Sequence, residues 1–170
     1  MNYKDFLRPG KGAADITPLL NNRAAFNSLI DDLISLFVSI QIDKVACVEG
    51  RGFLLGAPVA YGLKVGLVPI RSLGKLNNKV FSETLIDYSG KEKALEIHED
   101  AINTSEKILL IDDWVETGAT IKAAIKLIEK CGGKVVGIGA FMDDTKDDLR
   151  EELKKYNYQY LEKVVADDKF

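Results

Sequence analysis

The chain has 170 residues, 46% of them hydrophobic and 29% charged, which is typical of a folded domain and excludes disordered, collagen-like and low-complexity classes. A formal net charge of -3 at pH 7 provides no basic field for nucleic acid, so a bound anion would require a local site. The only histidine, His98, leaves little for multi-histidine metal sites or for nucleophilic catalysis that depends on histidine.

Cys47 and Cys131 lie far apart in the sequence, so neither a disulfide scaffold nor a zinc cluster is expected. Such thiols suit a reducing cytosol, and we expect a cytoplasmic protein. The charged N-terminal segment lacks the apolar run of a signal peptide. The longest uncharged apolar stretch, 52–63, is too short for a membrane span, which needs about 20 residues. The sequence therefore predicts neither a nucleic-acid partner nor a membrane partner.

Apolar residues at helical spacing predict helices, and short apolar runs predict strands. In chain order we expect an irregular start over 1–20, a helix over 23–40, a strand over 44–49, a helix over 53–63, a strand over 65–70, a basic loop over 71–79, a hairpin over 80–97, a strand over 107–113, a helix over 117–131, a strand over 135–142, a helix over 147–155 and a last strand over 158–165. Pro69 predicts an end or an irregularity in the second strand. Alternating strands and helices predict an α/β domain with a mostly parallel sheet, which binds ligands beyond the carboxyl ends of its strands.

The segment from Asp112 to Thr120 is the most informative part of the sequence. A hydrophobic strand ends in two carboxylates, Asp112 and Asp113, and a short loop with Thr117 and Gly118 then opens a helix. The start of a helix offers unpaired N–H groups and the positive end of a dipole, which suit a phosphate. Neighbouring carboxylates accept hydrogen bonds from sugar hydroxyls or hold Mg²⁺. The segment indicates a sugar-phosphate site, and the competing interpretation is an ordinary turn with Thr117 as helix cap.

The same segment resembles the signature with which type I phosphoribosyltransferases bind phosphoribosyl pyrophosphate (PRPP): a hydrophobic strand, two acids and then Thr-Gly-x-Thr. Four further regions are similar to those of the adenine phosphoribosyltransferase branch, and they occur in the expected order over about residues 5–140. They are the N-terminal hood with its two stretches at 5–10 and 15–18, the pyrophosphate loop at 49–53, the basic segment at 68–76 and the run at 95–102.

The resemblance implies a fold and a reaction. The fold would be an α/β, Rossmann-like, mostly parallel sheet flanked by helices, forming one domain over 1–170 with a small hood at 1–20 and a flexible loop region at 72–92. The reaction would transfer ribose 5-phosphate from PRPP to a purine base, adenine first, and release pyrophosphate with the help of Mg²⁺. The resemblance also implies a homodimer in which Lys75 of the basic loop serves the partner subunit.

The resemblance also assigns subsites. The PRPP-binding residues would be Asp112, Asp113, Glu116, Thr117, Gly118, Ala119 and Thr120. The pyrophosphate-binding residues would be Glu49, Gly50, Arg51, Arg71 and Lys75. The two aspartates would bind the ribose hydroxyls and would hold Mg²⁺ only indirectly, through PRPP. The family's cis peptide bond is expected between Glu49 and Gly50.

The base pocket departs from the family pattern. Ala13 and Ala14 stand in the hood where the adenine enzymes carry an aromatic residue and an arginine, so base contacts there would come largely from backbone groups. Trp114 replaces a bulky aliphatic residue, and we expect it either to stack on the base or to pack against neighbouring loops. Glu116 replaces an alanine and is a candidate catalytic acid or base near the purine.

Asp87 is the second candidate catalytic residue, because it stands at the position of the family's flexible-loop glutamate, and Glu83 is its competitor for contact with the base. The departures leave three alternatives open. The first is an enzyme that acts on adenine, and the second is an enzyme that acts on hypoxanthine, guanine or a modified purine. The third is a non-catalytic PRPP-binding regulator, which the altered hood favours. The retained cations Arg51, Arg71 and Lys75 favour the enzyme.

Overall fold

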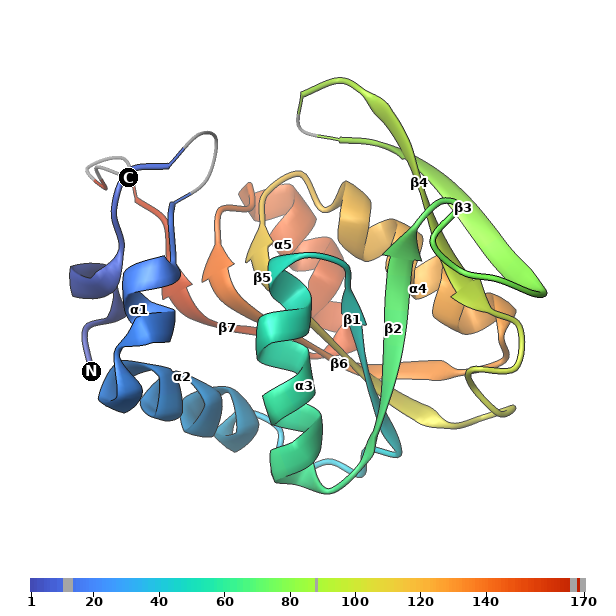
Figure 1. Cartoon of the computed structure of the whole chain (residues 1–170), viewed down its shortest axis with the longest axis horizontal. Helices are drawn as coiled ribbons and strands as arrows, with labels where there is room; N and C mark the ends of the chain where they lie inside the picture. Colours follow the sequence, from blue (N-terminus) through green and yellow to red (C-terminus); the bar gives the residue numbers. More distant parts are fainter. Residues whose placement is uncertain (11–13, 88, 166–167, 169–170) are drawn as a thin grey trace.

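The computed structural model describes residues 1–10, 14–87, 89–165 and 168, and it shows a seven-stranded sheet between two layers of helices (Figure 1). The elements are the 3-10 helix η1 (Tyr3–Phe6), α1 (Thr17–Asn21), α2 (Arg23–Ser35), β1 (Lys44–Val48), α3 (Arg51–Leu63), β2 (Gly66–Ser72), β3 (Val80–Ile86), β4 (Glu92–His98), β5 (Lys107–Val115), α4 (Ala119–Lys130), β6 (Lys134–Asp143), α5 (Asp147–Leu153), the 3-10 helix η2 (Lys154–Tyr156) and β7 (Tyr158–Lys163).

The strand order is β3-β4-β2-β1-β5-β6-β7, and the five strands from β2 to β7 in this order run parallel. Their carboxyl ends therefore meet at one edge of the sheet, where such folds bind ligands. The predicted α/β class and the mostly parallel sheet are confirmed.

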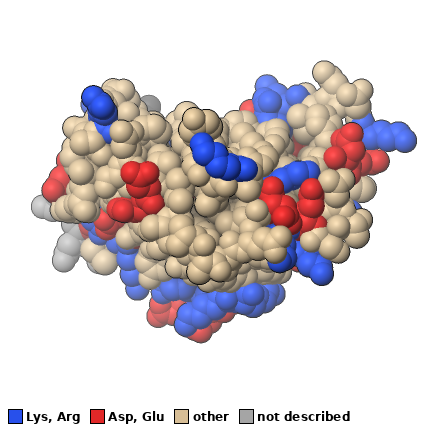
Figure 2. Space-filling view, turned by 90° about the horizontal axis from the view of Figure 1, so that it is seen from below, with Lys and Arg blue, Asp and Glu red and all other residues tan. Residues whose placement is uncertain are grey.

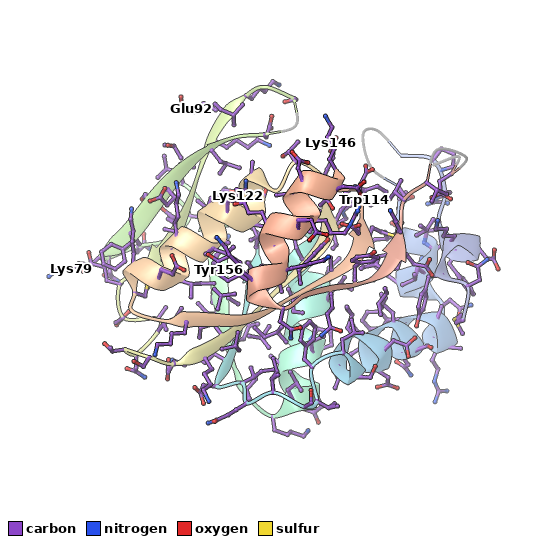
Figure 3. The ribbon with its side chains drawn as sticks, turned by 180° about the vertical axis from the view of Figure 1, so that it is seen from behind. Lys79, Glu92, Trp114, Lys122, Lys146 and Tyr156 are labelled. Carbon is purple, nitrogen blue, oxygen red and sulfur yellow. The ribbon has the colours of Figure 1, made fainter. Side chains whose placement is uncertain are left out.

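Helices α1, α2 and α3 cover one face of the sheet, and α4 and α5 cover the other (Figures 1 and 3). The central strand β5 packs against both layers. Leu109 and Ile111 belong to the core on the side of α2 and α3. Ile108 and Leu110 belong to the core on the side of α4. All four side chains are fully buried, which explains why this strand reads as a continuous apolar run.

Strands β3 and β4 form the predicted hairpin, which stands away from the body of the sheet (Figure 1). The two strands pair with each other along their whole length, from Val80 to Ile86 on β3. By contrast, β4 joins β2 only beside Arg71 and Ser72, where it runs antiparallel. The hairpin is thus fixed to the sheet at its base and reaches toward the edge where the parallel strands end.

Two expectations for the backbone are wrong. The first twenty residues are not wholly irregular, because Thr17–Asn21 forms α1 with a proline in its first turn, where a missing N–H costs nothing. Strand β2 also continues past Pro69 to Ser72. It bonds β1 through Ile70, whose carbonyl accepts a hydrogen bond from the Glu49 N–H at 2.8 Å. Pro69 therefore interrupts no bond of that ladder.

Charged groups of both signs share the molecular surface. Lys and Arg side chains lie among Asp and Glu around the face seen in Figure 2, and a broad uncharged area occupies its middle. This mixture agrees with the small net charge of -3. Among the residues described, no helix combines the length and apolar character that crossing a membrane would require.

Candidate active site

A cavity of about 690 Å³ opens at the carboxyl ends of β1 and β5, beneath the β3–β4 hairpin. This volume lies in the range of small-molecule sites, about 300–1,000 Å³. Its lining comes from four segments that are distant in sequence: Val48, Glu49 and Arg51; Ser72 and Leu73; Leu85, Asp87, Lys93, Ala94 and Leu95; and Asp112–Ile121. Most of the residues predicted to bind PRPP and the base thus line one cavity.

Asp112 and Asp113 form the floor of the cavity, and each is only 7% exposed. The Asp113 N–H donates to Asp112 Oδ1 at 2.9 Å. Arg51 Nε lies 2.8 Å from Asp113 Oδ2 without the alignment of a hydrogen bond. That oxygen is buried and ion-paired with Arg51, and it accepts no hydrogen bond from the described residues.

The environment of the two aspartates disfavours their charged forms. Burial raises the pKa of Asp112 well above its usual range, and the neighbouring charge of Asp113 raises it further. Burial also raises the pKa of Asp113, and the Arg51 guanidinium opposes this shift. The Arg51 charge opposes the shift of both carboxylates, and a bound cation would favour their ionisation further, because it would add positive charge beside them.

The loop after β5 forms a cradle for an anion. Glu116 and Thr117 are exposed, and Gly118 adopts a left-handed conformation with φ of 71° that favours glycine. Helix α4 then begins at Ala119, whose N–H donates a long hydrogen bond of 3.4 Å to Thr117 Oγ1, so the expected threonine cap is present but weak. Gly118, Ala119, Thr120 and Ile121 all line the cavity. The N–H groups at the start of a helix have no partner within the helix, so this turn suits a phosphate.

The loop after β1 orients Arg51 toward the cavity. Gly50 has φ of 107° and ψ of -130°, a conformation that side chains with a Cβ rarely adopt, and the peptide bond before it is trans, not cis as expected. Glu49 accepts hydrogen bonds from the Ser72 N–H at 2.7 Å and from Arg71 Nη2 at 3.3 Å. These donors lower the pKa of Glu49 to about 2, so the carboxylate is ionised and ties β1 to β2.

Four of the predicted binding residues lie outside the described lining of the cavity, namely Gly50, Arg71, Lys75 and Ala14. Arg71 pairs with Glu49 instead. Lys75 is exposed, and its N–H donates to the buried Glu96 carboxylate. Ala14 is fully buried, and its carbonyl accepts a hydrogen bond from Arg51 Nη1 at 2.7 Å. Ala13 lies outside the described residues. For these positions the assigned roles stay predictions.

The hairpin brings Asp87 to the cavity, whereas Glu83 faces α4. Asp87 lines the cavity and forms an ion pair with Lys93 Nζ at 2.7 Å, which together with hydrogen bonds from Ser89 and Lys91 lowers its pKa. Glu83 pairs with Lys130 at 2.5 Å. Of the two competing candidates, Asp87 is therefore the one in position to reach a ligand. Sequence reasoning missed Lys93, which was visible only as one of several lysines near a loop.

Trp114 both lines the cavity and packs against the core. It lies at the carboxyl end of β5, on the side of the molecule where α5 begins (Figure 3). Its side chain also forms a hydrogen bond with Asp144, whose own pKa burial raises. The two interpretations drawn from the sequence, a stacking surface and a packed tryptophan, are therefore compatible for one side chain.

The donor set of the cavity fits a cation held jointly with a substrate. Within the described part of the chain, no group of three or more His, Cys, Asp or Glu side chains could hold a metal ion alone. Mg²⁺ is commonly held by one or two carboxylates together with substrate phosphates. Asp112 and Asp113 match that pattern.

Comparisons with known proteins agree with this geometry. Residues 15–170 match the phosphoribosyl transferase domain family. The chain is 42% identical over 153 residues to the adenine phosphoribosyltransferase of Desulforamulus reducens, a match that covers 90% of this chain and 88% of that protein. It also resembles the crystal structure of adenine phosphoribosyltransferase from Thermoanaerobacter pseudethanolicus, with a TM-score of 0.85, 36% identity and coverage of 95% of this chain and 98% of that one.

A second solved structure broadens the likeness. The enzyme from Giardia lamblia, complexed with 9-deazaadenine, has a TM-score of 0.86 and 27% identity, with coverage of 96% of this chain and 97% of that one. Sequence, fold and the cavity at the strand ends point to one family, so this chain belongs to the phosphoribosyl transferases, as an enzyme similar to the adenine phosphoribosyltransferases.

Proposed function

We propose that this protein transfers the 5-phosphoribosyl group from PRPP to adenine, giving adenosine monophosphate and pyrophosphate in purine salvage. The observation that carries the proposal is the joint position of two buried aspartates and the start of helix α4 in one cavity. In a sugar phosphate the ring hydroxyls and the phosphate dianion are only a few bonds apart, so the aspartates can bind the hydroxyls while the helix start binds the phosphate.

The loop from Glu116 to Thr120 binds the 5-phosphate through its N–H groups and the threonine hydroxyls. Asp113, whose Oδ2 accepts no hydrogen bond from the described residues, binds a ribose hydroxyl as Arg51 turns toward the pyrophosphate, and Asp112 supports it. Mg²⁺, when bound with PRPP, would supply positive charge to the pyrophosphate oxygens, and the two aspartates would hold it through the substrate. Arg51 stabilises the negative charge that develops on the leaving pyrophosphate, because a guanidinium fork suits phosphate oxygens.

The base occupies the part of the cavity between Trp114 and the hairpin. The half-buried indole provides an apolar face for a purine ring. Asp87 is ionised by its pairing with Lys93, and it acts on the base from the hairpin side as a hydrogen-bond acceptor. Glu116, exposed at the entrance of the phosphate loop, acts near the purine as the second acid or base. Ala13 and Ala14 supply backbone contacts rather than a stacking surface.

A homodimer forms part of the proposal. Several large apolar side chains are exposed on α3 and β2 and just after β2, namely Leu54, Tyr61, Leu67 and Leu73, and burying them against a second copy would remove apolar surface from water. Such a dimer gives the exposed Lys75 a role in the partner's cavity. The free cysteines, Cys47 and Cys131, agree with a cytoplasmic location.

The experiment is pyrophosphate release from PRPP, with and without Mg²⁺, across a panel of adenine, hypoxanthine, guanine and substituted purines. We expect release to require Mg²⁺ and to be fastest with adenine. Fastest release with an oxopurine would reassign the base and leave the reaction intact. Binding of PRPP by calorimetry without release for any base would instead indicate a regulator that binds PRPP.

A further inference from the structure

Helix α5 rests on the loop that binds phosphate in the proposed function. A Cβ placed on Gly118 would lie 2.8 Å from Leu149 Cδ2 and 2.9 Å from Leu149 Cδ1, closer than side chains tolerate. Leu149 is 9% exposed and belongs to the core that also contains Val115 and Ile121, the residues on either side of the loop. The left-handed backbone of Gly118 is therefore packed directly beneath one leucine.

A buried network holds α5 in this position. Asp143, at the end of β6, is fully buried, and its carboxylate accepts hydrogen bonds from Tyr158 OH at 2.8 Å and Thr145 Oγ1 at 2.6 Å. Arg150, on α5 next to Leu149, donates from Nε to the same carboxylate at 2.8 Å and from Nη2 to the Thr145 carbonyl. Three separate donors fix Asp143, so the arginine and its helix have a defined position.

Further contacts join this region to the loop. The Asp144 N–H donates to the Val115 carbonyl at 2.8 Å, and the Asp144 side chain bonds Trp114. Glu152 pairs with Lys122 across the two helices at 2.7 Å (Figure 3 labels Lys122 on α4, beside α5). Within the loop, Glu116 and Thr117 are exposed, and the helix start has only the long hydrogen bond to Thr117 Oγ1, so much of the support of the loop comes from outside.

We propose that Leu149 and Arg150 are positioning residues for phosphate binding: Leu149 holds Gly118 in the conformation that aims the loop N–H groups, and Arg150 holds Leu149 in place through Asp143. The inference rests on the proposed function of the loop. Neither residue lines the cavity, so neither touches the substrate. Because N–H groups bind phosphate only at close distance, a small shift of Gly118 weakens binding strongly.

The chain offers a matched pair of variants as the test. Leu149→Ala and Leu153→Ala both truncate buried leucines of α5 in the same core, but the three atoms nearest to a Cβ on Gly118 all belong to Leu149. We expect Leu149→Ala to raise KM for PRPP roughly tenfold with kcat nearly unchanged, and Leu153→Ala to leave KM unchanged at a similar loss of stability. Equal KM values for the two variants would overturn the inference, since both would then act through stability alone.

A second measurement does not depend on turnover. Amide hydrogen exchange at 117–120 should be faster in Leu149→Ala than in Leu153→Ala, and Arg150→Met should show the same acceleration, partly restored in Arg150→Lys. Unchanged exchange in Leu149→Ala would refute the positioning role even if the wild-type protein failed to bind PRPP, which would separately refute the proposed function. If an alanine variant does not fold, the milder Leu→Val pair gives the same comparison.

Discussion

Gly52 in the first turn of α3 gives a sharp test of the ribose site. It is buried, and a Cβ at this position would lie 3.1 Å from Asp112 Oδ1 and 3.6 Å from the Ile111 carbonyl. A contact of 3.1 Å is tighter than nearly all Cβ contacts, so the Asp112 carboxylate must move by a few tenths of an ångström. Gly52→Ala therefore displaces a group of the proposed site while it changes the surface of the protein very little.

The expected effect separates stability from binding. Alanine gains at most about 1 kcal/mol of helix propensity over glycine, which offsets the cost of the tight contact and leaves the free energy of unfolding nearly unchanged. A hydrogen bond to a charged group contributes about 1.5–3 kcal/mol. Loss of one such bond between the carboxylates and a ribose hydroxyl corresponds to a roughly 10- to 150-fold weaker PRPP affinity.

Calorimetric titration with PRPP and Mg²⁺, next to denaturant unfolding, measures both quantities. Gly56→Ala is the control, because its Cβ would lie 2.5 Å from Cys47 Cβ and 2.7 Å from Cys47 Sγ, on the same helix but away from Asp112. We expect that variant to lose about 1–3 kcal/mol of stability from overpacking and to keep its PRPP affinity once folded. Wild-type PRPP affinity in Gly52→Ala would refute the role given to Asp112.

Burial raises the pKa of Asp112, so the folded apoprotein keeps a proton on this carboxyl that the unfolded chain releases near pH 4. The free energy of unfolding should therefore fall as the pH rises from about 4 through the pKa of the folded state. Denaturant unfolding of Asp112→Asn should lack this fall. Glu96 accepts three backbone N–H bonds from 74–76 and so holds the basic loop that carries Lys75. Glu96→Gln should therefore raise KM for pyrophosphate in the reverse reaction roughly tenfold, and an unchanged KM would show that this loop does not take part in binding pyrophosphate. Glu116→Ala should change the relative rates among bases more than it changes KM for PRPP, and a lost PRPP affinity with an unchanged base ranking would assign Glu116 to the phosphate loop alone.

Much of the fold follows from local patterns in the sequence. Strand β5 is covered on both faces and reads as a continuous apolar run, whereas α4 is covered on one face and shows helical spacing of its apolar residues. Both patterns can be recognised in the sequence without knowledge of the elements that pack against them. Helix α1 was missed because it is five residues long, too short to show periodicity. The course of β2 through Pro69 depends on which neighbour strand needs the missing N–H, and this is a property of the sheet rather than of the segment.

The site was predictable where chemistry is concentrated in one segment. Asp112, Asp113 and the loop that follows are adjacent in sequence, so their proximity in space was assured. The choice between Asp87 and Glu83 was not, because hairpin register decides which side chain faces α4 and which faces the cavity. The contact of Leu149 with Gly118 joins residues of two elements, and no local pattern marks it.

Arg51 connects the N-terminal segment to the floor of the cavity. One guanidinium donates to the Ala14 carbonyl at 2.7 Å and lies 2.8 Å from the Asp113 carboxylate. A ligand that draws this group toward its own phosphates competes with the hydrogen bond that Arg51 donates to the Ala14 carbonyl. Thermodynamic linkage makes such coupling reciprocal: whatever holds the N-terminal segment in place changes the affinity for the phosphate-bearing ligand by the same factor. If the hood contacts the base as predicted, this one side chain would couple binding of the base to binding of PRPP.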